Sequence, residues 1–226
     1  MKTSEEFYTE LTPDGLASRK KKVHTKKELS YLIKFLDKKD RILDIGCGYG
    51  RFTIPLAKKK YSIEGIDITP ALIEKAKRDA KKEKVNINFK IGDMRKLPYK
   101  NDNFNKIICM WSVFIELSKK KDQLIAIREM KRILVPKGFA LIEMPVPITS
   151  NLVIEDKKIG DKIILKKGQK IAVNVLGNIE AMPSYRHNKS TLINLMKECK
   201  IKKFKVFTDK FGGRERFFLQ FWKDLK

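Results

Sequence analysis

The chain of 226 residues has no long hydrophobic segment, few cysteines and few histidines. Its longest apolar run, residues 107–115, is far shorter than the roughly 20 residues that a helix needs to cross a bilayer. The start, MKTSEEFYTEL, lacks the apolar core of a secretory signal peptide. The three cysteines are scattered without CxxC spacing, which argues against a zinc site and favours reduced thiols. We therefore expect a cytoplasmic protein without a bound metal.

Acidic residues are scarce relative to basic ones. Lys and Arg number 51 and Asp and Glu number 27, so the formal net charge is +24. Such an excess is consistent with an anionic partner such as RNA, DNA or a membrane surface. However, the basic residues are mainly lysines spread along the chain in short runs, whereas phosphate-reading surfaces use arginine more heavily. The composition therefore leaves open both an RNA-binding face and a solvated lysine-rich surface.

Alternating apolar runs and helical segments predict an α/β fold. Thr25 and Glu28 have capping-box spacing, which predicts a helix over 26–37, and Thr69 and Ser118 can cap two later helices. Because the β-like runs are nearly continuous in apolar residues, we expect a parallel sheet covered on both faces. These runs are residues 41–45, 61–68, 87–93, 104–111 and 139–145, the last after a turn at Pro136-Lys-Gly138.

The pattern changes after residue 145. Residues 146–184 form a long connection with short β-like pieces, where a short connection would suffice. Long connections in compact domains are usually lids or binding loops, so we expect a β-rich lid that covers the acceptor site and helps to set acceptor specificity. Residues 185–226 predict a helix and two β runs that pair antiparallel around Gly212-Gly213. With a helical arm over 1–38 and a core over 39–145, the whole chain is predicted to be one domain. Its fold class is α/β: a doubly wound, mostly parallel seven-stranded sheet with an antiparallel last strand.

The most specific motif is the stretch LDIGCGYGRFT, residues 43–53. Gly46, Gly48 and Gly50 follow the first predicted strand at alternate positions. A dinucleotide site requires G-x-G-x-x-G, whose third glycine would fall on Arg51. No G-x-x-x-x-G-K-[ST] run of a P-loop exists either. Both phosphate-binding interpretations therefore fail on spacing.

The run Asp44-Ile-Gly-Cys-Gly-Tyr-Gly50 resembles motif I of the class I S-adenosylmethionine (SAM)-dependent methyltransferases, with a type-11-like methyltransferase domain. The resemblance extends over about residues 25–145. Asp67 ends the second predicted strand, and Asp93 follows the third, as in that family. One departure is Asn105, where family members often carry Asp at the start of the fourth strand. That position usually serves structure, so we do not expect a loss of activity.

The resemblance implies a SAM pocket. SAM carries a sulfonium, an ammonium, a ribose and an adenine, but no phosphate. Asp44 would lie near the ammonium, Asp67 would accept from both ribose hydroxyls, and Asp93 would take the adenine amino group. Alternatively, Asp44 holds only the turn, and Cys47 is expected to be a buried filler without chemistry. The expected cofactor-binding residues are Asp44, Gly46, Cys47, Gly48, Gly50, Asp67, Ile68, Asp93, Met94 and Trp111.

Signatures that would name the methyl acceptor are absent. No [DN]-P-P-[YF] follows the fourth strand, which weakens an amino acceptor on adenine or glutamine, and no Pro-Cys pair for cytosine C5 chemistry occurs there. Glu116 and Asp122 are the only nearby acids for a metal-dependent catechol type, and they make no convincing metal set. Acceptor-site candidates therefore lie outside the core.

Two segments supply these candidates. After the lid, His187 can act as a base near neutral pH beside Tyr185, although a capped helix entrance explains the same residues equally well. In the N-terminal arm, polar side chains can close over the SAM pocket. The expected catalytic residues are His187 and Tyr185, and the expected substrate-binding residues are Tyr8, Arg19, His24 and Arg186.

Three functions fit these observations. The leading hypothesis is a methyltransferase of the broad group that includes the ubiquinone and menaquinone types. It would transfer the methyl group of SAM to a small molecule and leave S-adenosylhomocysteine as the product. The second is an RNA methyltransferase, acting on tRNA, that uses the basic surface. The third is a non-catalytic SAM-binding partner subunit. The absence of a recognisable RNA module favours the first.

Overall fold

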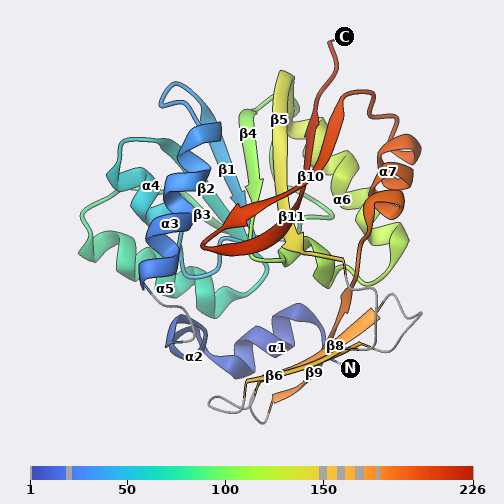
Figure 1. Ribbon diagram of the computed structural model, residues 1–226. Helices are drawn as coiled ribbons and strands as arrows, with labels where there is room; N and C mark the ends of the chain where they lie inside the picture. The colour runs from blue at the N-terminus through green and yellow to red at the C-terminus, as the bar shows by residue number, and fades with distance from the viewer. Residues whose placement is uncertain are drawn as a thin grey trace.

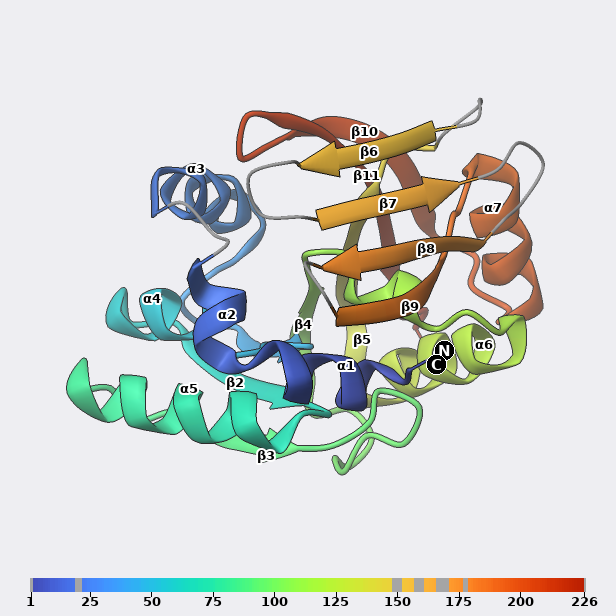
Figure 2. The same ribbon diagram turned by 90° about the horizontal axis from the view of Figure 1, so that it is seen from below.

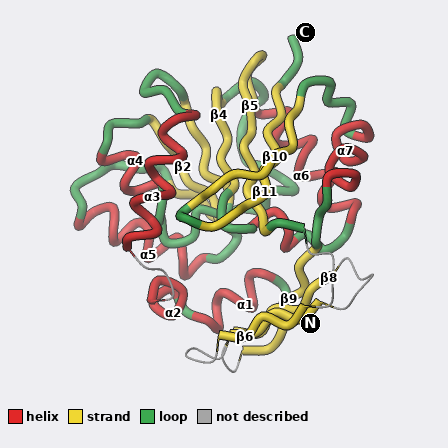
Figure 3. Tube along the Cα trace, in the orientation of Figure 1, coloured by secondary structure: helices red, strands yellow, loops and turns green. Residues whose placement is uncertain are grey.

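The computed structural model describes residues 2–18, 22–147, 152–156, 161–165, 171–176 and 179–225. Its centre is a seven-stranded sheet in the order β10-β11-β5-β4-β1-β2-β3 (Figures 1 and 3). The first five strands along the chain run parallel, and β11 and β10 are antiparallel to their neighbours, which confirms the predicted fold class. The strands are β1 (Arg41–Ile45), β2 (Ser62–Asp67), β3 (Phe89–Ile91), β4 (Phe104–Cys109), β5 (Leu134–Pro145), β10 (Phe204–Phe211) and β11 (Arg214–Trp222).

Successive residues of a strand point to opposite faces of the sheet. Because both faces of this sheet are apolar, helices pack on each of them. Ile42 of β1 packs with α3 (Lys22–Leu32), the short helix η1 (Ile33–Phe35) and α4 (Thr53–Lys58). Leu43 packs on the opposite face, against α6 (Lys120–Ile133) and α7 (Lys189–Glu198). A third apolar cluster joins α5 (Pro70–Lys82) to β3. The parallel strands are thus buried on both faces.

A second layer lies beyond the carboxyl ends of the parallel strands. It contains α1 (Ser4–Leu11), α2 (Pro13–Ser18) and an antiparallel sheet in the order β6-β7-β8-β9 (Figures 1 and 2). Phe7 and Leu11 of α1 pack against Met182 of β9, which attaches the arm to the small sheet. The strands of this sheet are β6 (Leu152–Asp156), β7 (Asp161–Leu165), β8 (Ile171–Leu176) and β9 (Ile179–Tyr185).

Several local expectations differ from the structure. Helix α3 begins at Lys22, before the predicted capping box, and the Thr25 hydroxyl accepts a hydrogen bond from Arg51 Nε at 3.0 Å instead. The N-cap of α6 is Lys119 rather than Ser118, and no side chain caps that helix. Pro136-Lys-Gly138 lies inside β5, where the register against β4 shifts, and is not a turn before the strand. These differences arise because tertiary partners override local capping and turn signals.

The Asn105 position has the structural role expected for it. Its side-chain oxygen accepts a hydrogen bond from the Arg41 backbone N–H at 2.8 Å and so links the starts of β4 and β1. Among the described residues, no helix is long and apolar enough to cross a membrane.

Candidate functional site

A cavity of about 590 Å³ opens at the carboxyl ends of β1, β2 and β4. This is the edge where ligands bind in open α/β sheets. Residues of α1 and β9 line it from the other side, so the cavity lies between the main sheet and the second layer. Its wall contains nine of the ten expected cofactor-binding residues: Asp44, Gly46, Cys47, Gly48, Asp67, Ile68, Asp93, Met94 and Trp111, with Gly50 outside it.

The glycine turn after β1 forms the floor of the cavity. The backbone N–H groups of Gly46 and Cys47 both donate to the Ile66 carbonyl, at 2.8 and 3.1 Å, which holds the turn against β2. Gly46 has φ +69°, and a Cβ there would lie 2.4 Å from a methyl group of Val113. Gly48 has φ +54° and nothing within 4 Å of an added Cβ. Gly46 therefore serves close packing, whereas Gly48 leaves open space for a ligand.

Asp67 sits at the end of β2 with its carboxylate directed across the turn. One oxygen accepts from the Gly48 N–H at 2.8 Å and the other from the Thr69 N–H at 2.9 Å. Burial raises the pKa of Asp67, and these backbone hydrogen bonds oppose the shift. The side chain is thus rigidly oriented at the cavity wall, where the resemblance expects the ribose hydroxyls.

Asp44 is the second carboxylate of the cavity and is almost fully buried. Thr53 at the start of α4 donates its hydroxyl to Asp44 at 2.7 Å. Burial raises the pKa of Asp44 to about 7, and the nearby Asp67 charge adds to the shift. A cationic ligand group would relieve this cost, so the turn role and the binding role are compatible.

At the far end of the cavity, Asp93 is held by its neighbour Arg95. The Arg95 guanidinium approaches Asp93 at 2.6 Å and also pairs with Asp122 at 3.4 Å. An adenine amino group would therefore have to share the Asp93 carboxylate with Arg95. The proposed adenine contact stays a prediction.

Trp111 follows β4 in a strained backbone conformation. Trp111 and Ser112 have φ of 59° and 67°, in the left-handed region that residues with side chains rarely adopt. The Trp111 N–H donates to the buried Glu143 carboxylate at 2.6 Å. Arg216 forms an ion pair with Glu143 and donates to the Ser112 hydroxyl at 2.6 Å. Two long-range contacts thus hold this segment in place.

The Trp111 ring packs under a buried ion pair. The Arg51 guanidinium lies over the ring, 4.2 Å from its centroid, and pairs with the nearly buried Glu28 of α3. Sequence reasoning did not single out Arg51, Glu28, Glu143 or Arg216 as site residues. A signal existed for Glu143, since it is the only charged residue in the apolar run 139–145.

Tyr8 and Glu116 meet in the cavity from distant parts of the chain. The Tyr8 hydroxyl of α1 donates to the Glu116 carboxylate of the short helix η2 (Val113–Glu116) at 2.6 Å. Burial raises the pKa of Glu116 to about 7, while hydrogen bonds from Tyr8 and Ser4 oppose the shift. Sequence reasoning placed Tyr8 among substrate residues but treated Glu116 only as part of an unconvincing metal set. Their pairing depends on folding of the arm.

The structure does not bring the predicted acceptor cluster to the cavity wall. His187 is buried between the rings of Phe114 and Tyr185, at centroid distances of 5.6 and 4.6 Å, and its Nδ1 lies 3.3 Å from the Thr191 hydroxyl. Burial lowers the pKa of His187 to about 3. This corrects the expectation of a base that titrates near neutrality, because a desolvated imidazolium is disfavoured.

Three more predicted acceptor residues, Tyr185, Arg186 and His24, are not on the described cavity wall. Burial together with the Arg216 charge lowers the pKa of Arg186 to about 10. His24 Nδ1 lies 3.0 Å from the Gly212 carbonyl, between α3 and the β10–β11 turn. Arg19 falls outside the described residues. Among the described residues, no group of three or more His, Cys, Asp or Glu could hold a metal ion.

Comparison with known proteins agrees with this geometry. The family model of the methyltransferase domain matches residues 42–138, which contain the glycine turn and the ends of β1, β2 and β4. Residues 42–138 are a methyltransferase domain, and the fold is that of SAM-dependent methyltransferases. A crystal structure of a SAM-dependent methyltransferase from Clostridium acetobutylicum matches with a TM-score of 0.72 at 13% identity, over 96% of this chain and 98% of that one. The fold therefore extends well beyond the matched motif region.

Curated relatives match a smaller share of the chain than the Clostridium acetobutylicum structure does. An uncharacterized methyltransferase of Schizosaccharomyces pombe is 34% identical over 49% of this chain and 41% of the relative. The demethylmenaquinone methyltransferase of Deinococcus radiodurans is 31% identical over 47% of this chain and 44% of the relative. The match thus spans less than half of these relatives.

Proposed function

We propose that the protein transfers the methyl group of SAM to a small-molecule acceptor inside the cavity. The observation that carries this proposal is the position of the cavity between the methyltransferase domain and the second layer. Ser4 and Tyr8 of α1 and Met182 of β9 lie on the wall opposite the glycine turn. The volume of about 590 Å³ lies in the range of small-ligand sites, roughly 300–1,000 Å³. A cavity of this size between two layers suits a small molecule better than a nucleic acid strand.

The residues of the wall fit SAM. The open space at Gly48 admits a ligand close to the backbone, and Asp44 is a buried carboxylate that a cationic group would stabilise. Asp67 presents oriented oxygens at the end of β2, where hydroxyl donors can reach them. When bound, SAM supplies an electrophilic methyl group on its sulfonium. These geometric features add to the support that the motif gives to the cofactor assignment.

The protein's own contribution is alignment and exclusion of water. Holding donor and acceptor in line can supply roughly 7–11 kcal/mol of the barrier. The strained Trp111–Ser112 segment is held by Glu143 and Arg216, which supports a fixed wall at the end of β4. Tyr8 and the arm cover the opposite side. The arrangement therefore supports catalysis by positioning.

The test is a transfer assay with tritium-labelled SAM on two pools from the source cells, total RNA and a small-molecule extract. We expect counts in the small-molecule pool. The control is Asp67→Ala, which should weaken SAM binding roughly ten- to a hundredfold through loss of charge-assisted hydrogen bonds and abolish the counts. Counts in RNA that depend on Asp67 would replace this proposal with an RNA methyltransferase. Counts in neither pool, with SAM still bound, would favour a partner subunit.

A further inference from the structure

Three carboxylates that line the cavity and are buried or half-buried, Asp44, Asp67 and Glu116, have no basic partner among the described residues, although the chain has a net charge of +24. Asp44 receives its hydrogen bond from Thr53, Asp67 from two backbone N–H groups, and Glu116 from Tyr8. All of these donors are neutral. Within the described part of the chain, no lysine, arginine or histidine forms an ion pair with any of the three. The cavity is thus locally acidic in a basic protein.

Three of the four described cations that line the cavity are paired with other acids. Arg51 pairs with Glu28, and Arg95 pairs with Asp93 and Asp122. Lys2 pairs with Glu10 of α1. Lys119 is exposed. Burial raises the pKa of all three carboxyl groups, and a cationic ligand group in the cavity would stabilise their ionised forms.

SAM accounts for two of these carboxylates under the proposed function, on which this inference rests. Asp44 and Asp67 flank the glycine turn after β1 and β2, where the family places the amino-acid and ribose parts of SAM. Glu116 is different, because it is reached from the arm and contacts Tyr8. We propose that the methyl acceptor is an amine, and that the Glu116 carboxylate binds its ammonium and removes its proton. Tyr8 holds Glu116 in position.

The proposed step balances in protons and electrons. An acceptor that arrives as R–NH₃⁺ gives one proton to the Glu116 carboxylate and becomes R–NH₂. The nitrogen lone pair forms a bond to the methyl carbon, and the carbon–sulfur bond breaks with its electron pair left on sulfur. The product is R–NH₂CH₃⁺, and the proton on Glu116 is released to solvent. No further reactant is needed.

The chemistry favours an amine over other acceptors. An anionic acceptor would be repelled by three carboxylates. A neutral hydroxyl gains little from them in the ground state, whereas an ammonium gains a charge-assisted hydrogen bond. Burial raises the pKa of Glu116 to about 7, which brings it closer to an amine of ordinary pKa near 10. The titratable groups that face Glu116 are Tyr8, Asp67 and Cys109.

A binding experiment tests the ammonium site without turnover. Sinefungin is a SAM analogue that carries an amine where SAM carries its methyl-bearing sulfonium, and S-adenosylhomocysteine lacks that charge. We expect Glu116→Gln to weaken sinefungin about ten- to a hundredfold and S-adenosylhomocysteine less than about threefold by calorimetry. The matched control Glu215→Gln, at an exposed carboxylate on β11, should change neither. Equal effects on both ligands, or none, would overturn the proposal.

A transfer experiment tests the acceptor class. The small-molecule extract is separated on a cation-exchange resin, and each fraction is incubated with labelled SAM and enzyme. We expect counts in the retained, cationic fraction, lost in Glu116→Gln and kept in Glu215→Gln. Counts in the unretained fraction alone would overturn the amine and leave the proposed function standing. Counts in neither fraction would contradict the proposed function. The sinefungin titration would then be the remaining test of an ammonium site at Glu116.

Discussion

At the scale of single residues, the site is built from unusual backbone conformations that neighbours hold in place. Gly46 and Gly48 have positive φ, and so do Trp111 and Ser112, which carry side chains. Each such residue with a side chain costs about 1–3 kcal/mol. Glu143 supports Trp111 through its backbone N–H. The strain lies at the cavity, where rigid positioning is needed.

The two glycines make a matched pair for substitution. Gly46→Ala adds both left-handed strain and a clash with Val113, so we expect a loss of roughly 2–4 kcal/mol of stability. Gly48→Ala adds the strain alone, about 1–2 kcal/mol, but its methyl group enters the open cavity. Urea unfolding and SAM calorimetry measure the two effects. Undiminished SAM affinity in a folded Gly48→Ala protein would remove Gly48 from the SAM site.

Asp44 predicts a pH dependence of stability. An unfolded Asp ionises near pH 3.9, whereas folded Asp44 keeps its proton to about pH 7. The folded state therefore binds more protons between these values, and Asp44 lowers stability as pH rises from about 4 to 7. At about 1.4 kcal/mol per pKa unit, the difference reaches at most roughly 4 kcal/mol.

The measurement compares wild type with Asp44→Asn by urea unfolding at several pH values. We expect the variant to gain stability relative to wild type as pH rises through this window, because Asn can accept the Thr53 hydrogen bond without ionising. Asp14→Asn, at an exposed position, serves as the control. Parallel profiles for wild type and Asp44→Asn would show that Asp44 ionises normally in the folded state.

At the scale of elements, the cavity needs parts that are far apart in sequence. Helix α1 supplies Tyr8, η2 supplies Glu116, and β9 supplies Met182. The apolar contact of Phe7 and Leu11 with Met182 joins the arm to the small sheet. The residues expected to hold SAM belong to the main-sheet loops instead. Cofactor binding is therefore assigned to the main-sheet loops, and closure of the acceptor side is assigned to α1 and the small sheet.

This separation predicts the effect of removing most of the insert. We expect a protein in which a short Gly-Ser linker replaces residues 148–181 to bind SAM within about threefold of wild type and to lose methyl transfer. The physical reason is that the loops of β1, β2 and β4 stay intact while the acceptor side opens to water. Calorimetry and the tritium assay measure the two properties. Surviving transfer would contradict the assignment of the insert as a lid.

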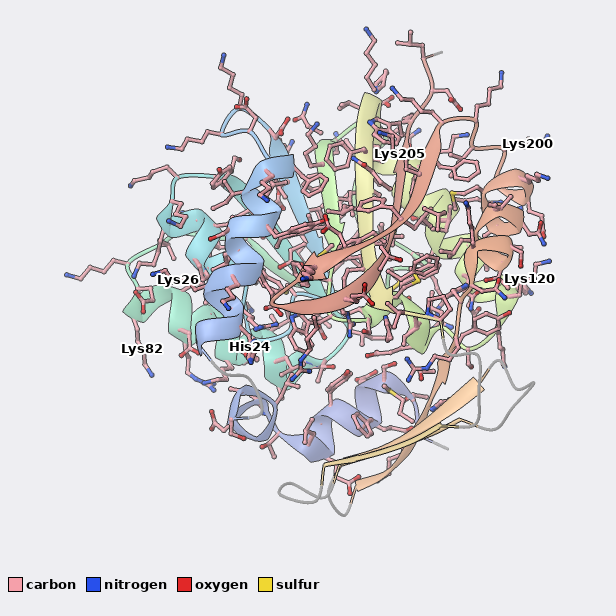
Figure 4. The ribbon with its side chains drawn as sticks, viewed as in Figure 1. His24, Lys26, Lys82, Lys120, Lys200 and Lys205 are labelled. Carbon is pink, nitrogen blue, oxygen red and sulfur yellow. The ribbon has the colours of Figure 1, made fainter. Side chains whose placement is uncertain are left out.

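At the scale of the whole molecule, charge is divided between surface and cavity. The labelled lysines Lys26, Lys82, Lys120, Lys200 and Lys205 are exposed and come from different elements around the fold (Figure 4). The unpaired carboxylates, in contrast, face the cavity. This distribution favours a solvated basic surface around an acidic site.

The charge distribution predicts a weak dependence of RNA binding on salt. A binding face that neutralises several phosphates would give a log–log slope near −0.9 per phosphate on duplex RNA or DNA, and less on single strands. We expect total tRNA to bind with a slope shallower than about −2, measured by filter binding between low and moderate salt. A steep slope, with transfer to RNA, would make the basic surface functional.

The sequence by itself determined the fold class and brought nine of the ten expected cofactor-binding residues to one cavity wall. Alternating glycines after an apolar strand and acids at the ends of the next strands are local patterns, and parallel strands bring their carboxyl ends to one edge. The near-continuous apolar runs predicted the parallel part of the main sheet, whereas the order of its strands is given by the structure.

Only the tertiary structure decided the acceptor side. His187 is a plausible base in sequence, yet packing against Phe114 and Tyr185 buries it and removes its charge. Tyr8 and Glu116 carry no shared motif, and they meet because the arm folds over the sheet edge. Burial, and with it pKa, depends on contacts between residues distant in the chain, and no local pattern encodes those contacts.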